Sequence, residues 1–206
     1  MNPKHGICVL TLGALLAGFS ASAEAEDPTL LALVDEAVAI ESKTPQEFSD
    51  LLRRTKLYAE LAPHRVDAVQ LLLGYVRQAG NAPRQIGAMR AVSAVLDGQI
   101  GGILADAFQD ADPAVRTAAV ETLAASSTEE KPYILGDFYR SEKDPKVRLA
   151  AMKATAETSP ILESYKFLAE AEKDPDPAIV RAAKELKSNP SRLGSRFTKP
   201  QYDRRK

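Results

Sequence analysis

Cysteine and histidine, on which much nucleophilic and metal chemistry depends, are almost missing from this chain of 206 residues. The single cysteine is Cys8, and the two histidines are His5 and His64. So few of these side chains cannot build a disulfide framework, thiol catalysis or a typical zinc site. His64 follows Pro63 at an expected helix start, where a solvated side chain is the ordinary interpretation. We therefore expect no enzyme active site, no metal and no cofactor.

A large net charge is also missing, because 27 basic residues stand against 28 acidic ones. This balance gives no argument for nucleic-acid binding by the chain as a whole. Beyond residue 23, no apolar run is long enough to cross a bilayer. Runs of alternating apolar and polar residues, which predict strands, are missing too, whereas alanine is abundant. These features predict an all-α fold.

The N-terminal segment has the layout of a secretory signal peptide. Lys4 provides a positive charge, residues 7–19 are apolar or small, and Ala21-Ser22-Ala23 has the pattern that signal peptidase recognises. The apolar run is too short for a permanent transmembrane span, although an uncleaved N-terminal anchor stays an alternative. We expect cleavage after Ala23 and a mature chain that is periplasmic or secreted.

Helix-start signals divide residues 28–187 into about ten short helices. Thr44 and Glu47 form an expected capping box for the second helix, and the third should carry Val66 on its apolar stripe. Residues 100–108 should form the fifth, because their apolar residues recur at helical spacing. Further starts are expected at Pro28, Pro63, Pro83, Lys131 and, capped by Ser159, at Pro160.

The C-terminal half repeats itself every 32 residues, at Asp112-Pro113, Asp144-Pro145 and Asp176-Pro177. Each aspartate can cap a helix, and proline suits the first helical position because its missing N–H costs nothing there. The same apolar pattern follows each pair, with Val115, Val147 and Ile179 in register. A period in the thirties built from two helices is typical of an α-solenoid. We predict an α-solenoid of about five antiparallel helix pairs.

The segments DPAVRTAA and DPKVRLAA, which open the first two of these copies, resemble HEAT repeats of the short variety named after phycobilisome lyases. The resemblance is close over residues 112–187, weaker over 81–111 and only architectural before them. It implies that Arg116 and Arg148 join a polar ladder with Asp residues between neighbouring repeats. The third copy has Val180 at this position, so the ladder should end there.

The chain divides into four parts. Residues 1–23 form the signal peptide, 24–80 a helical region with an acidic start, 81–187 the repeats, and 188–206 a basic tail that we expect to be disordered. The tail is either a solvated end or a tether that orders on an anionic partner. Its candidate partner-binding residues are Arg192, Arg196, Phe197, Lys199, Tyr202, Arg204 and Arg205.

These observations favour an exported, non-enzymatic binding or scaffold module that recruits a protein partner with its helical-repeat surface. Two alternatives stay open: an enzyme or enzyme subunit resembling the lyase-like HEAT proteins, and an envelope-associated structural protein held by its tail. An anionic envelope surface is therefore a second candidate partner. Nucleic acid is not expected for an exported chain, and a fold by itself does not select among these functions.

Overall fold

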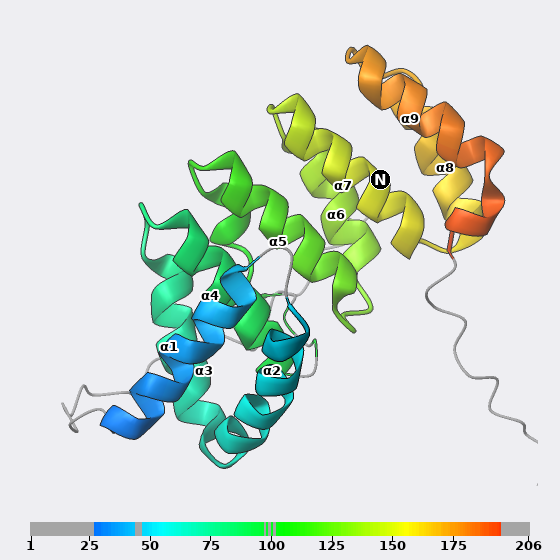
Figure 1. Ribbon diagram of the computed structural model, residues 1–206. Coiled ribbons are helices and arrows are strands. Elements are labelled where there is room, and N and C mark those ends of the chain that lie inside the picture. The colour runs from blue at the N-terminus through cyan, green and yellow to red at the C-terminus, as the bar shows by residue number, and fades with distance from the viewer. Residues whose placement is uncertain (1–26, 44–46, 97, 99, 101, 195–206) are drawn as a thin grey trace, which may run out of the picture.

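The computed structural model describes residues 27–43, 47–96, 98, 100 and 102–194, and Figure 1 shows how their helices are arranged. All regular structure within these ranges is helical, which confirms the predicted all-α class. The α-helices are α1 (Pro28–Ser42), α2 (Phe48–Leu61), α3 (Arg65–Arg77), α4 (Ala82–Val95), α5 (Pro113–Ala125), α6 (Lys131–Ser141), α7 (Pro145–Thr158), α8 (Ile161–Ala171) and α9 (Pro177–Ser188). Short 3-10 helices cover Ala62–His64, Ala107–Gln109 and Pro190–Arg192. No helix in the described part of the chain is long and apolar enough to span a membrane.

The helices stack in two layers, which confirms the predicted α-solenoid. One layer holds α4, α5, α7 and α9, each packed against the next, and α1 packs on α4. In the other layer α3 packs against α4, α6 against α5 and α7, and α8 against α7 and α9. Figure 1 shows α5, α7 and α9 side by side, with α6 and α8 behind them.

Aspartate followed by proline begins four of the helices. In three of them the aspartate carboxylate accepts a hydrogen bond of 2.7–2.8 Å from the amide two residues later: Asp112, Asp144 and Asp176. Asp27 caps α1 in the same way at 2.9 Å, although it lies outside the 32-residue pattern. These side chains occupy amides that the first turn of a helix leaves without partners.

One continuous core lies between the two layers. Val115, Val147 and Ile179 are buried at equivalent positions of α5, α7 and α9. Helices α1 and α4 approach each other closely at Gly87, where an added Cβ would lie 2.3 Å from the backbone oxygen of Val38. Only glycine therefore allows these two helices to pack at this distance.

The predicted fifth helix over residues 100–108 is wrong. Residues 102–106 form turns, and only Ala107–Gln109 forms a single 3-10 turn. Ile100 and Leu104 are nevertheless fully buried. Their helical spacing in the sequence therefore reflects burial in the core and not a helix. Three glycines between residues 98 and 102 explain the difference, because each costs a helix about 1 kcal/mol relative to alanine.

The start of α2 also differs from the sequence prediction. The helix begins at Phe48, and Glu47 is the residue that precedes its first turn. The carboxylate of Asp50 accepts a hydrogen bond of 3.2 Å from the Glu47 amide, which makes a capping box one helical turn later than expected. The predicted capping residue Thr44 lies outside the described residues.

Two further local expectations are wrong. Ser159 does not cap α8, because its hydroxyl donates a hydrogen bond of 2.7 Å to the carbonyl of Thr155 at the end of α7. Val66 is exposed on the first turn of α3, whereas Leu72 and Val76, further along the same expected stripe, are buried as predicted. For Val66 the reason is tertiary packing, which selects one helix face where the sequence pattern allows two. For Ser159 it is a local hydrogen bond to the carbonyl four residues earlier, which competes with capping.

The body of the protein continues into the segment from residue 188 onward, which the composition predicts to be disordered. Helix α9 includes Ser188, and Leu193 is only 2% exposed because it packs into the core. Arg192, a candidate tail residue, lies 3.7 Å from the Glu157 carboxylate. A single apolar residue among many polar ones is a weak sequence signal. The composition of the tail therefore does not predict that Leu193 is buried.

Candidate functional site

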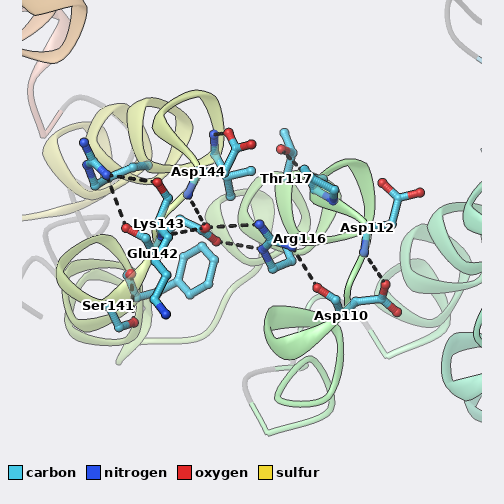
Figure 2. Close-up of polar contacts among 12 residues, drawn as sticks. Asp110, Asp112, Arg116, Thr117, Ser141, Glu142, Lys143 and Asp144 are labelled. Carbon is cyan, nitrogen blue, oxygen red and sulfur yellow. Dashed lines mark hydrogen bonds and ion pairs between the residues drawn. The ribbon is translucent and has the colours of Figure 1, made fainter. Parts of the chain in front are cut away.

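A ladder of polar side chains connects neighbouring repeats. Arg116 on α5 donates two hydrogen bonds, of 2.8 and 3.1 Å, to the Glu142 carboxylate in the loop before α7 (Figure 2). Arg148 on α7 binds the Asp174 carboxylate before α9 in the same way, with two bonds of 3.0 Å. Each arginine also donates to backbone carbonyls of the loop before its own helix. One arginine side chain therefore joins two consecutive loops of the solenoid.

The carboxylates of this ladder are buried and hydrogen-bonded. The side chains of Glu142 and Asp174 are each 4% exposed. Glu142 also accepts from the Asp144 amide, and Asp174 accepts from the Asp176 amide and the Tyr139 hydroxyl. Burial alone would raise both pKa values, but the hydrogen bonds from the arginines and amides hold the pKa of each carboxyl below its usual range. Both groups are therefore ionised at neutral pH.

A third rung extends the ladder toward the N-terminus. Gln85 on α4 occupies the position equivalent to Arg116 and donates a hydrogen bond of 2.9 Å to the Asp110 carboxylate. The acceptors Asp110, Glu142 and Asp174 are 32 residues apart, and each lies two positions before a capping aspartate. Sequence reasoning named the capping aspartates and missed these acceptors, although their spacing is the signal that identifies them.

The ladder does not continue past α9. Val180 occupies the ladder position there, and Arg181 is exposed one residue later. The outer surface of α9 is polar, since Arg181, Lys184 and Glu185 are all exposed. A polar outer face is what closes the end of a stack of repeats. We therefore assign the ladder to the connection between repeats and seek the functional surface elsewhere.

The acidic start of the helical region is largely paired with cations. Arg53 donates two bonds of 2.6 Å to Glu36, and Arg54 pairs with the buried Glu41 carboxylate. On the first of these pairs the hydrogen bonds from Arg53 lower the pKa of Glu36. Helix α2 therefore neutralises much of the negative charge that the sequence concentrates in α1.

The lone histidine of the described residues lies on the surface. His64 is exposed in the 3-10 turn before α3. Across residues 27–43, 47–96, 98, 100 and 102–194, no group of three or more His, Cys, Asp or Glu side chains is arranged to hold a metal ion.

Helix α2 exposes an apolar face, which we call the α2 face and define by Phe48, Leu51 and Leu52. These residues lie at positions i, i+3 and i+4, so they share one side of the helix. Phe48 is 75% exposed and Leu52 is 61% exposed. The opposite side of α2 buries Leu57 and Leu61 against the solenoid. The helix is therefore apolar on two sides, and only one of them is covered.

A second exposed apolar surface lies at the N-terminal ends of α6 and α8, and we call it the α6–α8 surface. It consists of Tyr133, Ile161 and Leu162, of which Tyr133 is 76% and Leu162 is 67% exposed. Tyr133 also lines a shallow groove of about 230 Å³ between the two helices, together with Pro160 and several charged side chains. Isolated exposed apolar residues are normal, whereas contiguous patches mark interaction sites.

The remaining candidate residues of the tail lie outside the described residues: Arg196, Phe197, Lys199, Tyr202, Arg204 and Arg205. Of the candidates in the tail, Arg192 is placed at the C-terminal end of the solenoid beside Glu157. The chain leaves the described region at Gly194, next to Ile161 of α8.

The capping role of Asp144 gives a direct prediction. Replacing Asp144 by alanine should lower the thermal unfolding midpoint, because the Lys146 and Val147 amides lose the carboxylate that accepts their hydrogen bonds. Asp144→Asn should restore most of the loss, since asparagine caps helices about as well as aspartate. Circular dichroism during heating measures both variants. Equal midpoints for Asp144→Ala and the unmodified protein would show that this cap does not stabilise α7.

Comparison with known proteins gives a match to one family model over part of the chain. The family model for HEAT repeats matches residues 70–156, a segment that extends from α3 to α7. No curated protein and no solved structure matches the chain. The match extends to residue 70, further toward the N-terminus than the region of close resemblance at 112–187.

Proposed function

Because residues 70–156 of the chain are HEAT repeats, which generally mediate protein–protein interaction, we propose that the protein is an exported, non-enzymatic module that recruits a protein partner. The α2 face is the surface that we assign to this partner. The partner is a protein that presents a complementary apolar surface.

The exposure of the α2 face carries this proposal. Leaving Phe48, Leu51 and Leu52 in water costs free energy that a partner would recover by covering them, about 1.5–3 kcal/mol for each side chain that becomes fully buried. Large aromatic and aliphatic side chains at the centre of an interface commonly contribute most of the binding energy. Three such side chains on one helix match the way an amphipathic helix binds a partner groove.

The position of α2 in the stack supports the same surface. Helix α2 packs mainly on α1, at the N-terminal end of the solenoid. Figure 1 shows α2 beside α1, away from the row formed by α5, α7 and α9. The opposite end of the stack is closed by the polar outer surface of α9. At the N-terminal end, by contrast, the exposed apolar side chains of α2 provide a surface that a partner could cover.

Export is the second part of the proposal and rests on the N-terminal sequence, from Lys4 to Ala23. The mature protein should begin near Glu24 in the periplasmic or secreted fraction. Intact mass measurement of protein from each cell fraction gives the processing site directly. Soluble cytoplasmic protein that keeps Met1 would contradict export.

The partner surface is tested with two matched double variants of the mature chain. Phe48→Ser/Leu52→Ser changes the α2 face, and Tyr133→Ser/Leu162→Ser changes the α6–α8 surface by the same two kinds of residue at similar exposure. Each protein is used to capture partners from intact envelope. The protein that co-purifies with the unmodified chain should be lost only with the α2 variant. Its retention by the α2 variant would contradict the assignment.

A further inference from the structure

The α6–α8 surface needs an explanation of its own, because it is as exposed as the α2 face and lies elsewhere. Ile161 and Leu162 occupy the first turn of α8, and Tyr133 occupies the first turn of α6. The groove between the helices brings Tyr133 together with Pro160, which precedes α8. Ile161 and Leu162 follow Pro160 directly on α8, so the α6–α8 surface spans the N-terminal ends of the two helices that line this groove.

We propose that the chain's own C-terminal segment, residues 195–206, covers this surface. The first argument is where the chain leaves the described region. Leu193 is buried, and Gly194 has a φ of +62°, a left-handed backbone conformation that favours glycine. A Cβ at Gly194 would lie 2.9 Å from Cγ1 of Ile161. Gly194, the described residue that precedes the segment, therefore lies beside the surface that we assign to the segment.

The second argument is the length and composition of the segment. Phe197 follows Gly194 by three residues, a reach of about 10 Å for extended chain, which is enough to cover Leu162. Tyr202 follows by eight residues, a reach of about 26 Å. Tyr133 and Pro160, the residue before α8, line the same groove, so this reach is enough for Tyr202 to contact Tyr133 on α6. Phe197 would therefore cover Leu162 on α8, and Tyr202, further along the segment, would cover Tyr133 on α6.

Charge provides the third argument. Glu129 and Glu130 are exposed immediately before α6, whereas Gly194 lies beside Ile161 of α8. The segment ends in Arg204, Arg205 and Lys206, its most basic part. A segment that runs from α8 to α6 would bring these cations to the acidic pair. Opposite charges attract over about 8 Å at physiological ionic strength, so they favour this direction of docking.

Connection within one chain strengthens such a contact. A short flexible linker holds a segment at an effective concentration in the millimolar range, so weak contacts suffice to keep it docked. The segment would then be folded back on the solenoid instead of acting as a tether, and the α2 face would stay free for the partner. Neither conclusion requires the proposed partner to exist, because docking can be measured with the purified chain alone.

The absence of tryptophan makes a specific experiment possible. Phe197→Trp in the mature full-length chain introduces a single fluorescent indole into the segment. Docking predicts emission at shorter wavelength than for free tryptophan in water, slow quenching by acrylamide, and no change when the protein is diluted. Adding Tyr133→Ser/Leu162→Ser should shift the emission to longer wavelength and make quenching faster, whereas Phe48→Ser/Leu52→Ser should leave both unchanged. Circular dichroism of each variant establishes that the solenoid is folded, and these four side chains are exposed.

Three results would overturn the inference. If Phe197→Trp, without any change to the α6–α8 surface, emitted at the wavelength of free tryptophan in water, the segment would not be docked. Protection that disappears on dilution would place it on a second copy of the chain. Protection that appears only when vesicles containing an anionic phospholipid are added would show that it is a membrane tether. Under docking, Glu129→Gln/Glu130→Gln should reduce the salt dependence of the quenching rate, because it removes the acidic end of the surface.

Discussion

Replacing Arg148 by alanine should lower the free energy of unfolding by about 2–4 kcal/mol. The variant removes the guanidinium from Asp174, whose carboxylate is 4% exposed and receives two bonds from Arg148. The carboxylate keeps its bonds to Tyr139 and to the Asp176 amide, but it loses its opposite charge in a site that water hardly reaches. Removing one partner of a buried ion pair is costly for this reason. Urea denaturation followed by circular dichroism measures the change.

Arg140 provides the matched control. Its guanidinium also donates two bonds to a carboxylate, that of Glu170, at 2.9 and 3.1 Å. This pair is on the surface, where the two side chains are 50% and 47% exposed. Arg140→Ala should therefore cost less than about 1 kcal/mol, as exposed ion pairs usually do. Equal losses for Arg140→Ala and Arg148→Ala would contradict the structural role of the ladder.

The same pair makes stability depend on pH. The pKa of Asp174 is lowered in the folded protein, so its contribution is present above its ordinary pKa and is lost as the pH falls through the folded-state value. Without Arg148 this lowering should largely disappear. The difference in stability between the unmodified protein and Arg148→Ala should therefore shrink in acid.

Replacing Leu193 by alanine should cost about 2–3 kcal/mol, although the residue lies beyond the last α-helix. Its side chain is 2% exposed in the core, and its removal leaves a cavity there. Thermal and urea unfolding of the mature chain measure the loss.

Truncation provides the control for Leu193. A chain that ends after Gly194 keeps the side chain and loses only residues 195–206, so its loss should be much smaller than that of Leu193→Ala. A chain that ends after residue 188 should be at least as unstable as Leu193→Ala. If the truncation after 188 unfolded like the full-length protein, the C-terminal segment would not be part of the core, as the composition alone suggested.

The features that the sequence predicts well are local ones. Asp112, Asp144 and Asp176 recur at equal spacing before a proline and an apolar helical pattern, so their capping roles could be assigned without knowledge of the fold. The 32-residue period then implies that the helices stack, because each repeat has to bury its apolar face against the next. Arg116 and Arg148 could be placed in a ladder from their resemblance to HEAT repeats.

What the sequence did not predict depends on contacts between distant residues. Ile100 and Leu104 have helical spacing but lie outside any helix, because burial requires only that they face the core. The sequence does not indicate the α2 face. An apolar residue such as Leu52 is expected to be buried, and its exposure becomes apparent only when the helices that pack against α2 are known. The structure shows which side of α2 packs against the solenoid and which side is exposed.

Placing a photo-crosslinking residue at position 52 tests the proposed partner surface most directly. The mature chain with the crosslinker in place of Leu52 is irradiated in intact envelope, and a second chain carries it in place of Leu162, which is similarly exposed. The chain with the crosslinker at position 52 should give one discrete adduct with a second protein, and the chain with it at 162 should not. No adduct from position 52, or the same adduct from both positions, would contradict a partner site on α2.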